Sequence, residues 1–293
     1  KMVEDDPFIP IAWQKDHKGM QGSEYWIDDD TVTVDEGDEY ERYTKIYSAT
    51  EHFITEWLEA RDLAIAQSYE LNRLGVTKQL CNRLLEPFMW HTVLVTATEW
   101  RNFFELRCPR YYFEPENLYF KSRKDFGGKY HECFDSDEFV NWTEEQWLGI
   151  NQSQAEIHIQ KIAEMMFDCY NESIPKELEA GEWHIPFGDK IDYALDKWNF
   201  LPNTIELWGK DMSEYGIKVS TARCARLSYM TFDGEIDYEK DIKLHDQLLE
   251  SHHASPFEHC CRVLTEEEYN ILGKMVLNPK NGYIFENGWV DNF

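Results

Sequence analysis

The sequence has no long apolar run and no C-x-x-C pair of cysteines. A membrane-spanning helix needs about 18 or more consecutive apolar residues, and no stretch approaches that length, so we expect no membrane span, anchor or signal peptide. The seven cysteines are odd in number and lack metal-ligand spacing, which argues against a disulfide framework and against a zinc site. We therefore expect a protein of the reducing cytoplasm, or of the host cytoplasm if the source is viral.

Basic residues are also scarce. The 29 Lys and Arg residues are outnumbered by 56 Asp and Glu residues, which gives a formal net charge of -27. This charge repels the phosphate backbones of DNA and RNA, and no basic patch stands out, so general nucleic-acid binding is not expected. A small anionic ligand is not excluded, because two or three arginines that converge in a pocket can hold one phosphate by local charge-assisted hydrogen bonds.

The chain does contain enough apolar material for a sizeable core. Of its 293 residues, 42% are hydrophobic and 15% are aromatic, and this length permits one large domain or about two small ones. Helical spacing and capping residues predict helices over 48–74, 77–85, 98–107, 154–170, 221–227 and 238–249. Runs rich in β-branched residues predict strands over 90–96 and 260–265. We expect loop over 1–47, 176–216 and after 265, and an insertion over 108–150. The fold class expected is α+β, with helices packed on a small mixed or antiparallel sheet.

Two polar motifs flank the helix expected over 238–249. Residues 225–229 read A-R-L-S-Y, and residues 253–259 read H-A-S-P-F-E-H. These segments resemble the A-R-x-S-[YF] and H-x-[ST]-P-F-E-H motifs of the flavin-dependent thymidylate synthases, in order and spacing. Residues 102–107 read N-F-F-E-L-R and are similar to the N-F-x-x-L-R segment of the same family.

The resemblance covers roughly residues 1–107 and 151–265 and implies a single catalytic domain over 1–293. Its two motif-bearing halves would be 1–107 plus 151–175, and 217–293, with an insertion at about 108–150. The implied fold is that of the thymidylate synthase-complementing proteins. It would be circularly permuted, as in phage-type members, because the A-R-x-S and S-P-F-E-H motifs follow N-F-x-x-L-R here. The family also implies a homotetramer with sites between subunits.

The activity that the resemblance implies is the reductive methylation of dUMP to dTMP. The implied cofactors are FAD and NADPH, or NADH in its place, and methylenetetrahydrofolate is the implied co-substrate. In such a reaction the cofactor carries the electron chemistry, so the site needs no protein nucleophile. The absence of a Pro-Cys dipeptide agrees with this, because the flavin-free thymidylate synthases use a cysteine nucleophile in a Pro-Cys-His context.

The resemblance also implies roles for individual residues. Arg107 would be the catalytic residue, which holds the uracil ring and favours loss of its imino proton. Arg83 would join Arg107 in binding the substrate. Seven further residues would bind cofactor: Thr96, Thr98, Asn102, Leu106, Ser228, His253 and Ser255.

Each of these residues also has a structural alternative. Arg223 and Arg226 lie three apart, and they could form ion pairs on an acidic protein. Arg83 could pair with Glu86, and Asn102 could be an ordinary residue of a helix surface. His252 and His253 could compensate the dipole at a helix C-terminus. A metal site at these histidines is disfavoured, because the spacing fits no zinc pattern and Pro256 prevents a helical H-E-x-x-H arrangement.

One family motif, R-H-R-x-x-S-x-N-E-x-S-x-R, is absent from the sequence. In the permuted order it would precede Lys1, and we expect the printed chain to lack residues at both ends. Three hypotheses stay open: an active enzyme, a split enzyme whose missing part is another polypeptide, and a catalytically inactive nucleotide-binding or flavin-binding homologue that acts as an assembly subunit.

Overall fold

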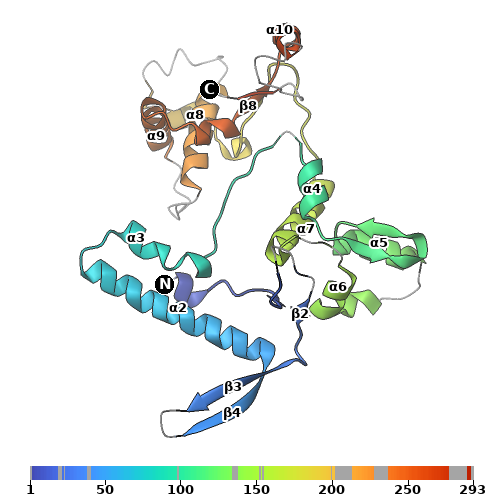
Figure 1. Ribbon diagram of the computed structural model, residues 1–293. Coiled ribbons are helices and arrows are strands. Elements are labelled where there is room, and N and C mark those ends of the chain that lie inside the picture. The colour runs from blue at the N-terminus through green and yellow to red at the C-terminus, as the bar shows by residue number, and fades with distance from the viewer. Residues whose placement is uncertain are drawn as a thin grey trace. The chain divides into compact units, whose positions relative to one another are not determined.

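The chain divides into two compact units in a computed structural model. The first unit comprises Lys1–Trp90 and Trp100–Ile174, and the second comprises His91–Glu99 and Pro175–Phe293 (Figure 1). The structure describes residues 2–18, 22, 24–37, 41–97, 99–133, 138–151, 153, 155–198, 200–201, 213–227, 237–276 and 289–291. We describe each unit separately.

The first unit begins with short elements where the sequence predicts loop. These are α1 (Met2–Asp5), β1 (Trp13–Gln14), β2 (Tyr25–Trp26), β3 (Thr31–Gly37) and β4 (Arg42–Ser48). Strands β3 and β4 form an antiparallel hairpin with Thr31 opposite Ser48. The prediction of loop over 1–47 is therefore wrong. Alternating Thr and Val residues at 31–34 favour a strand, and ion pairing of Glu36 with Lys45 across the hairpin offsets the local excess of acids.

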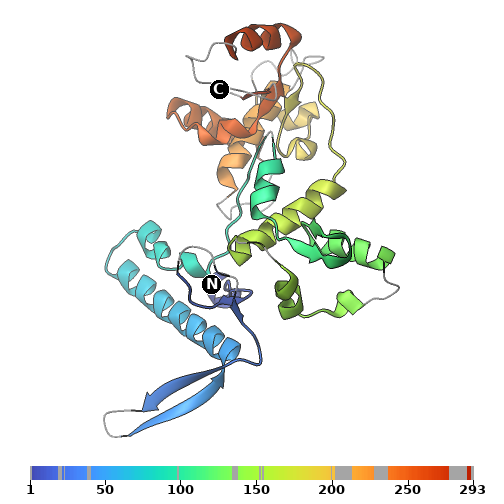
Figure 2. The same cartoon turned by 45° about the vertical axis from the view of Figure 1, so that its right-hand side comes forward.

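The hairpin leads into the long helix α2 (Ala49–Arg73), as Figure 1 shows. Ser48 is its N-cap residue, although its side chain makes no capping hydrogen bond. The helix ends at Leu74 and Gly75, where a φ of 92° requires glycine. The chain then turns back along α2 as α3 (Lys78–Arg83) and the short helix η1 (Glu86–Phe88), which Figure 2 also shows. Both predicted helices are confirmed.

The predicted strand over 90–96 is wrong, because the described residues of this segment form no strand. Val93 and Val95 are exposed. Their β-branched side chains favour an extended backbone, but a strand also needs a partner that takes up its backbone hydrogen bonds.

Helices α4 (Arg101–Arg107) and α7 (Ile157–Glu172) form the other helical part of the first unit. Phe104 is buried between them, and its ring centroid lies 5.3 Å from that of Phe167 and 5.6 Å from that of Tyr170. The Cys108 thiol donates a 3.4 Å hydrogen bond to the Ala163 carbonyl. Both predicted helices are confirmed, although α4 begins at Arg101 rather than at the expected residue 98.

Residues 108–150 fold around a cluster of aromatic side chains. The elements are β5 (Tyr111–Phe113), η2 (Glu114–Glu116), β6 (Leu118–Phe120), α5 (Arg123–Cys133), η3 (Glu138–Asn141) and α6 (Glu144–Ile150). The buried members of the cluster are Tyr111, Phe113, Phe126 and Trp147. Arg123 ties this segment to α7, because its guanidinium binds Glu144 and its backbone N–H donates to Glu164, which is 3% exposed. The described residues of this segment therefore pack as part of the first unit.

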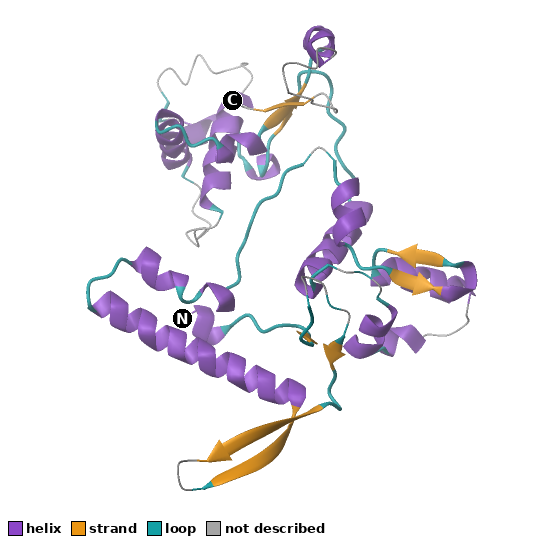
Figure 3. Cartoon of the chain, viewed as in Figure 1, coloured by secondary structure: helices purple, strands orange, loops and turns teal. Residues whose placement is uncertain are grey.

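The second unit contains helices and one small sheet. The described elements are β7 (Trp183–His184), η4 (Gly188–Lys190), η5 (Leu195–Trp198), α8 (Ser213–Arg226), α9 (Tyr238–Glu250), η7 (Ser255–His259), β8 (Cys261–Val263), α10 (Glu266–Val276) and β9 (Trp289–Asp291). Strand β8 lies between β7 and β9, antiparallel to both (Figure 3). Trp198 is fully buried in the core, and its ring stacks on that of Tyr238 at 4.7 Å.

The predictions for this unit are partly right. Helix α9 and strand β8 are confirmed. Helix α8 begins at Ser213 rather than near 221, because buried Ile217 and Val219 extend its packed face. The loop predicted after 265 is wrong, since α10 occupies 266–276. Thr265 and Glu268 form a capping box, in which each side chain bonds to the backbone or hydroxyl of the other.

The fold is α+β, with small sheets whose described strand pairs are all antiparallel. This confirms the expected fold class. Among the described residues, no helix combines the length and the apolarity needed to cross a bilayer.

The capping box of α10 predicts a pH-dependent contribution to stability. Glu268 accepts hydrogen bonds from the Arg262 guanidinium and from the backbone and hydroxyl of Thr265, which lower its pKa from 4.5 to about 2. Because the pKa is lower in the folded protein, the stabilisation is present above about pH 4.5 and is lost as the pH falls toward about 2. We predict that Glu268→Gln lowers the urea midpoint at neutral pH, and that its difference from wild type narrows below pH 4.5.

Glu267→Gln is the matched control, because it removes the same charge from an exposed neighbour on α10. It should leave the midpoint almost unchanged. A Glu268→Gln deficit of equal size at neutral and acidic pH would contradict this account.

Candidate functional site

The helices that adjoin the two polar motifs contact each other in the second unit. Helix α8, which ends with the first two residues of the first motif, packs against α9 and against η7, which contains Ser255–His259 of the second motif. At the centre of this contact the Cys260 thiol donates a 3.3 Å hydrogen bond to Ser220 Oγ, and Ser220 Oγ donates a 2.6 Å bond to the Pro186 carbonyl. Thr221 Oγ1 donates to Cys260 Sγ at 3.7 Å. Ser220, Thr221 and Ala222 are completely buried, and their small side chains permit the close approach of η7.

Arg223 and Arg226, at the C-terminal end of α8, bind an acidic residue of α9. Asp241 is 3% exposed, and its carboxylate lies 2.7 Å from Arg226 Nη1 and 3.5 Å from Arg223 Nε. The Arg223 guanidinium also lies 5.6 Å from the centre of the Tyr238 ring. Burial raises the pKa of Asp241, while the two arginines oppose that rise. The structural alternative for these two arginines was ion pairing at the surface. They are ion-paired, but to a buried carboxylate, and the pair joins α8 to α9.

His252 and His253 lie directly after the last turn of α9. The His252 N–H donates to the Leu249 carbonyl at 3.2 Å, and the His253 N–H donates to the Leu248 carbonyl at 3.0 Å, which is the Schellman arrangement. His252 has a φ of 57°, a conformation that usually belongs to glycine. The His253 ring is exposed, and its Nδ1 lies 2.8 Å from Ser251 Oγ. The two histidines thus lie at a helix C-terminus, as their structural alternative predicts. His253 is also accessible to a ligand.

Ser255 opens η7 with its side chain exposed. It was expected in an extended or turn geometry, but it lies in a 3-10 helix with Pro256 as the second residue. This short helix is not the α-helix that an H-E-x-x-H site requires. Nowhere in the described ranges do three or more His, Cys, Asp or Glu residues gather as a metal site would need.

His259, the last residue of the second motif, meets one of the predicted cofactor residues. Thr96 Oγ1 lies within hydrogen-bonding distance of His259 Nδ1, at 3.0 Å, although the two residues are far apart in sequence. Burial lowers the pKa of His259, which favours a neutral ring. The loop that precedes Trp100 therefore reaches the segment that carries the second motif. Sequence patterns gave no sign of this contact, since Thr96 was assigned to a strand.

Three predicted residues lie on α4 in the first unit. Asn102, Leu106 and Arg107 are all exposed. Arg107 is exposed although it lies one turn after the buried Phe104, and among the described residues its guanidinium has no hydrogen-bond or ion-pair partner. It is therefore accessible to an anionic ligand. The structural alternative for Asn102, a residue of a helix surface, agrees with its exposure.

Arg83 is already paired. Its Nη1 lies 2.9 Å from Glu86 Oε1, so the alternative of a salt bridge is confirmed. The remaining predicted residues, Thr98 and Ser228, lie outside the described residues.

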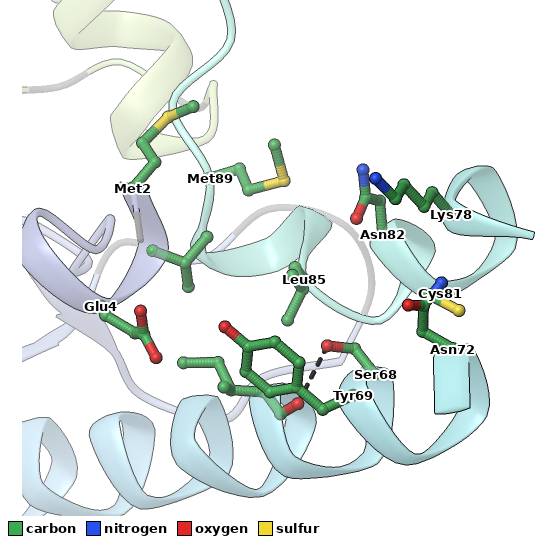
Figure 4. A pocket seen from close by; sticks show the side chains of 12 residues that line it. Met2, Glu4, Ser68, Tyr69, Asn72, Lys78, Cys81, Asn82, Leu85 and Met89 are labelled. Atoms are coloured by element: carbon green, nitrogen blue, oxygen red, sulfur yellow. Dashed lines mark hydrogen bonds between the residues drawn. The ribbon is translucent and has the colours of Figure 1, made fainter. Parts of the chain in front are cut away.

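A pocket of about 280 Å³ lies between α1, α2 and α3 of the first unit (Figure 4). Its walls are mainly apolar, with Tyr69, Lys78 and Asn82 among the polar lining residues. Ser68 is buried there, and its hydroxyl donates to the Ile65 carbonyl. Arg83 is not among the lining residues, and no sequence motif pointed to this pocket.

Three buried or partly buried thiols, those of Cys108, Cys224 and Cys260, are unsuited to nucleophilic chemistry. Burial raises the pKa of Cys108 and of Cys224 to about 12, and it also raises the pKa of Cys260. A thiol with a raised pKa is protonated near neutral pH and is a weak nucleophile. The exposed donors are instead a guanidinium, an imidazole, a hydroxyl and an amide, which bind anions and the edges of heterocycles.

Comparison of the chain with models of protein families, with curated proteins and with solved structures found no match. A functional assignment therefore rests on the motif segments and on their contacts.

The left-handed conformation of His252 predicts a stabilising substitution. A side chain in this region costs about 1 kcal/mol, whereas glycine adopts it freely. We predict that His252→Gly raises the free energy of unfolding by about 1 kcal/mol, measured by urea unfolding with far-UV circular dichroism. His253→Gly is the control, and it should be neutral or destabilising because its φ is not positive. A His252→Gly protein no more stable than wild type would contradict the assignment of strain.

Proposed function

We propose that the chain is a flavin-dependent thymidylate synthase of the circularly permuted, phage type. In this proposal it converts dUMP to dTMP with methylenetetrahydrofolate, FAD and NADPH, and it acts as a homotetramer. The proposal rests on the resemblance of three segments, and one structural observation carries it further. Helix α8, which ends with Ala225 and Arg226 of the A-R-L-S-Y segment, packs directly on η7, which contains Ser255–His259 of the H-A-S-P-F-E-H segment.

The packed contact between α8 and η7 could hold the exposed residues of a binding site in fixed positions. Its buried side is made of small hydrogen-bonded groups, while His253 and Ser255 stay exposed at its edge. A rigid buried side holds exposed donors in place, which reduces the entropy lost when a ligand binds. Thr96 reaches the same segment through His259. In the proposal, these residues of the second unit hold the flavin.

Arg107 has the role of substrate arginine. Its guanidinium has no acidic partner among the described residues, so it can approach an anionic pyrimidine without first breaking an ion pair. A guanidinium beside the imide edge of uracil stabilises the ring after loss of its imino proton, which makes the ring carbon more nucleophilic. Arg83 is less suited to bind dUMP, because Glu86 must release it first.

The residues fit a flavin and a nucleotide by the chemistry of their donors. Bound flavin supplies the hydride that completes the methyl group, and the protein supplies orientation and charge. The raised pKa values of Cys108, Cys224 and Cys260 support a mechanism without a thiolate nucleophile.

A second candidate is a catalytically inactive nucleotide-binding homologue that acts as an assembly subunit. One specific observation favours it: Arg83, Arg223 and Arg226 are all engaged by carboxylates of the same chain. Arginines that neutralise internal carboxylates contribute little to phosphate binding. The two candidates differ in turnover rather than in affinity for dUMP.

The test is turnover with dUMP that carries tritium on the ring carbon that becomes methylated. The full chain, supplied with FAD, NADPH and methylenetetrahydrofolate, should bind flavin and release tritium to water. Arg107→Ala should lower kcat/KM roughly 10²-fold, the usual size of effect when a charge-stabilising group is removed. Its circular dichroism spectrum should not change, because Arg107 is exposed.

Arg101→Ala is the matched control, since Arg101 begins the same helix and is also exposed. It should retain a kcat/KM close to that of wild type. Binding of dUMP without tritium release would favour the inactive homologue. A protein that takes up neither flavin nor dUMP would exclude both candidates.

A further inference from the structure

An aromatic hollow lies in the first unit, apart from every residue assigned above. Strands β1 and β2 pair so that Trp13 stands directly opposite Trp26. Helix α2 brings Phe53, Glu56 and Trp57 to the same place, at the i, i+3 and i+4 positions of one helix face. The side chains line an open hollow of about 390 Å³, within the range of about 300–1,000 Å³ that is usual for small-molecule sites.

The rings form walls rather than one flat platform. The planes of Trp13 and Trp57 meet at 73°, those of Trp26 and Phe53 at 74°, and those of Trp13 and Phe53 at 55°. Trp57 is held in place because its Nε1 donates a 2.9 Å hydrogen bond to the Phe8 carbonyl. A flat sugar or base needs a ring face on which it can stack, whereas steeply inclined rings surround a rounded group.

The electrostatics of the hollow favour a cation. The faces of aromatic rings carry partial negative charge and attract ammonium groups, most strongly on tryptophan. Lys15 demonstrates this within the chain, because its Nζ lies 4.8 Å from the centre of the Trp26 ring. Glu56 is the one charged residue among those that line the described hollow, and its side chain is 63% exposed. Its nearest basic group is the His52 imidazole, 3.9 Å away.

We propose that this aromatic hollow binds a quaternary ammonium group, such as the trimethylammonium of choline. The tryptophan and phenylalanine rings surround the methyl groups, and the Glu56 carboxylate balances the charge from the rim. A methylated ammonium fits better than a bare one because it has no N–H groups that need hydrogen bonds, and the lining is mainly apolar. This site is independent of the proposed dUMP chemistry.

The test is isothermal titration of the full chain with choline chloride, at constant ionic strength. The comparison ligand is the neutral isostere of choline, in which a tert-butyl group replaces the trimethylammonium group. We expect choline to bind and the isostere to bind about tenfold more weakly, since the two differ only in charge. Equal affinities would show an apolar hollow without preference for cations, and they would overturn the proposal.

Two pairs of variants locate the site. Trp13→Leu should abolish choline binding, whereas Trp90→Leu removes an exposed tryptophan that does not line the hollow and should have no effect. Glu56→Gln should weaken binding about threefold, whereas Glu59→Gln removes the same charge from an exposed position on α2 and should not. Glu56 is exposed, so its variant tests the site even if Trp13→Leu does not fold.

Several other results would overturn the proposal. No binding of choline at millimolar concentrations would do so, as would equal losses in the two members of either variant pair. Binding of a proline-rich peptide in place of choline would assign the aromatic hollow to a protein partner instead.

Discussion

The close approach of η7 to α8 is the contact on which the second unit depends. It is possible because consecutive residues of α8, Ser220, Thr221 and Ala222, are small and fully buried. Cys260 fills the remaining space and satisfies both hydroxyl-bearing neighbours with one sulfur atom. A larger side chain at any of these positions would force the two elements apart, at a cost of typically 1–3 kcal/mol. The exposed residues His253 and Ser255 of the second motif thus adjoin this packed contact.

A buried ion pair fixes the same helix from the other side. Asp241 accepts both Arg223 and Arg226, and removal of one partner from such a buried pair commonly costs about 3–5 kcal/mol. Arg226 of the A-R-x-S motif therefore helps to hold α8 against α9, which is a role separate from ligand binding. Arg83 and Arg107 differ in their pairing. Arg83 is paired with Glu86, whereas Arg107 has no such partner in the described chain. In a protein with a net charge of -27, an arginine without an internal carboxylate is the better candidate for binding an anion.

Local sequence patterns predicted the long helices. Features that depend on contacts between distant segments could not be predicted from these patterns. Helix α2 was predictable because apolar residues recur at helical spacing between Ser48 and Gly75, and the structure confirms both ends. Strand 90–96 was predicted from β-branched residues alone, which cannot reveal whether a partner strand exists. Helix α10 was missed although Thr265 and Glu268 form a capping box, which is a local signal for the start of a helix. At Ser48 the side chain makes no capping hydrogen bond, although a helix does begin there.

For the predicted site residues, too, local spacing was informative, but contacts that depend on tertiary packing could not be predicted. Spacing correctly predicted the helix α9 that separates the two motifs. It did not reveal Asp241 as the partner of both arginines, or the contact of Thr96 with His259, since each depends on tertiary packing. The sequence allowed two states for Arg83, Arg223 and Arg226: paired with a carboxylate of the chain, or available to a ligand. Only the structure shows that all three are paired.

Hydrogen exchange with ligand tests the central claim most directly. If the packed motif segments form one binding surface, FAD and dUMP together should slow amide exchange both in the last turns of α8 and across 251–259. The β3–β4 hairpin should exchange as before. Slowed exchange in both segments would support the account, and unchanged exchange in both at saturating ligand would contradict it.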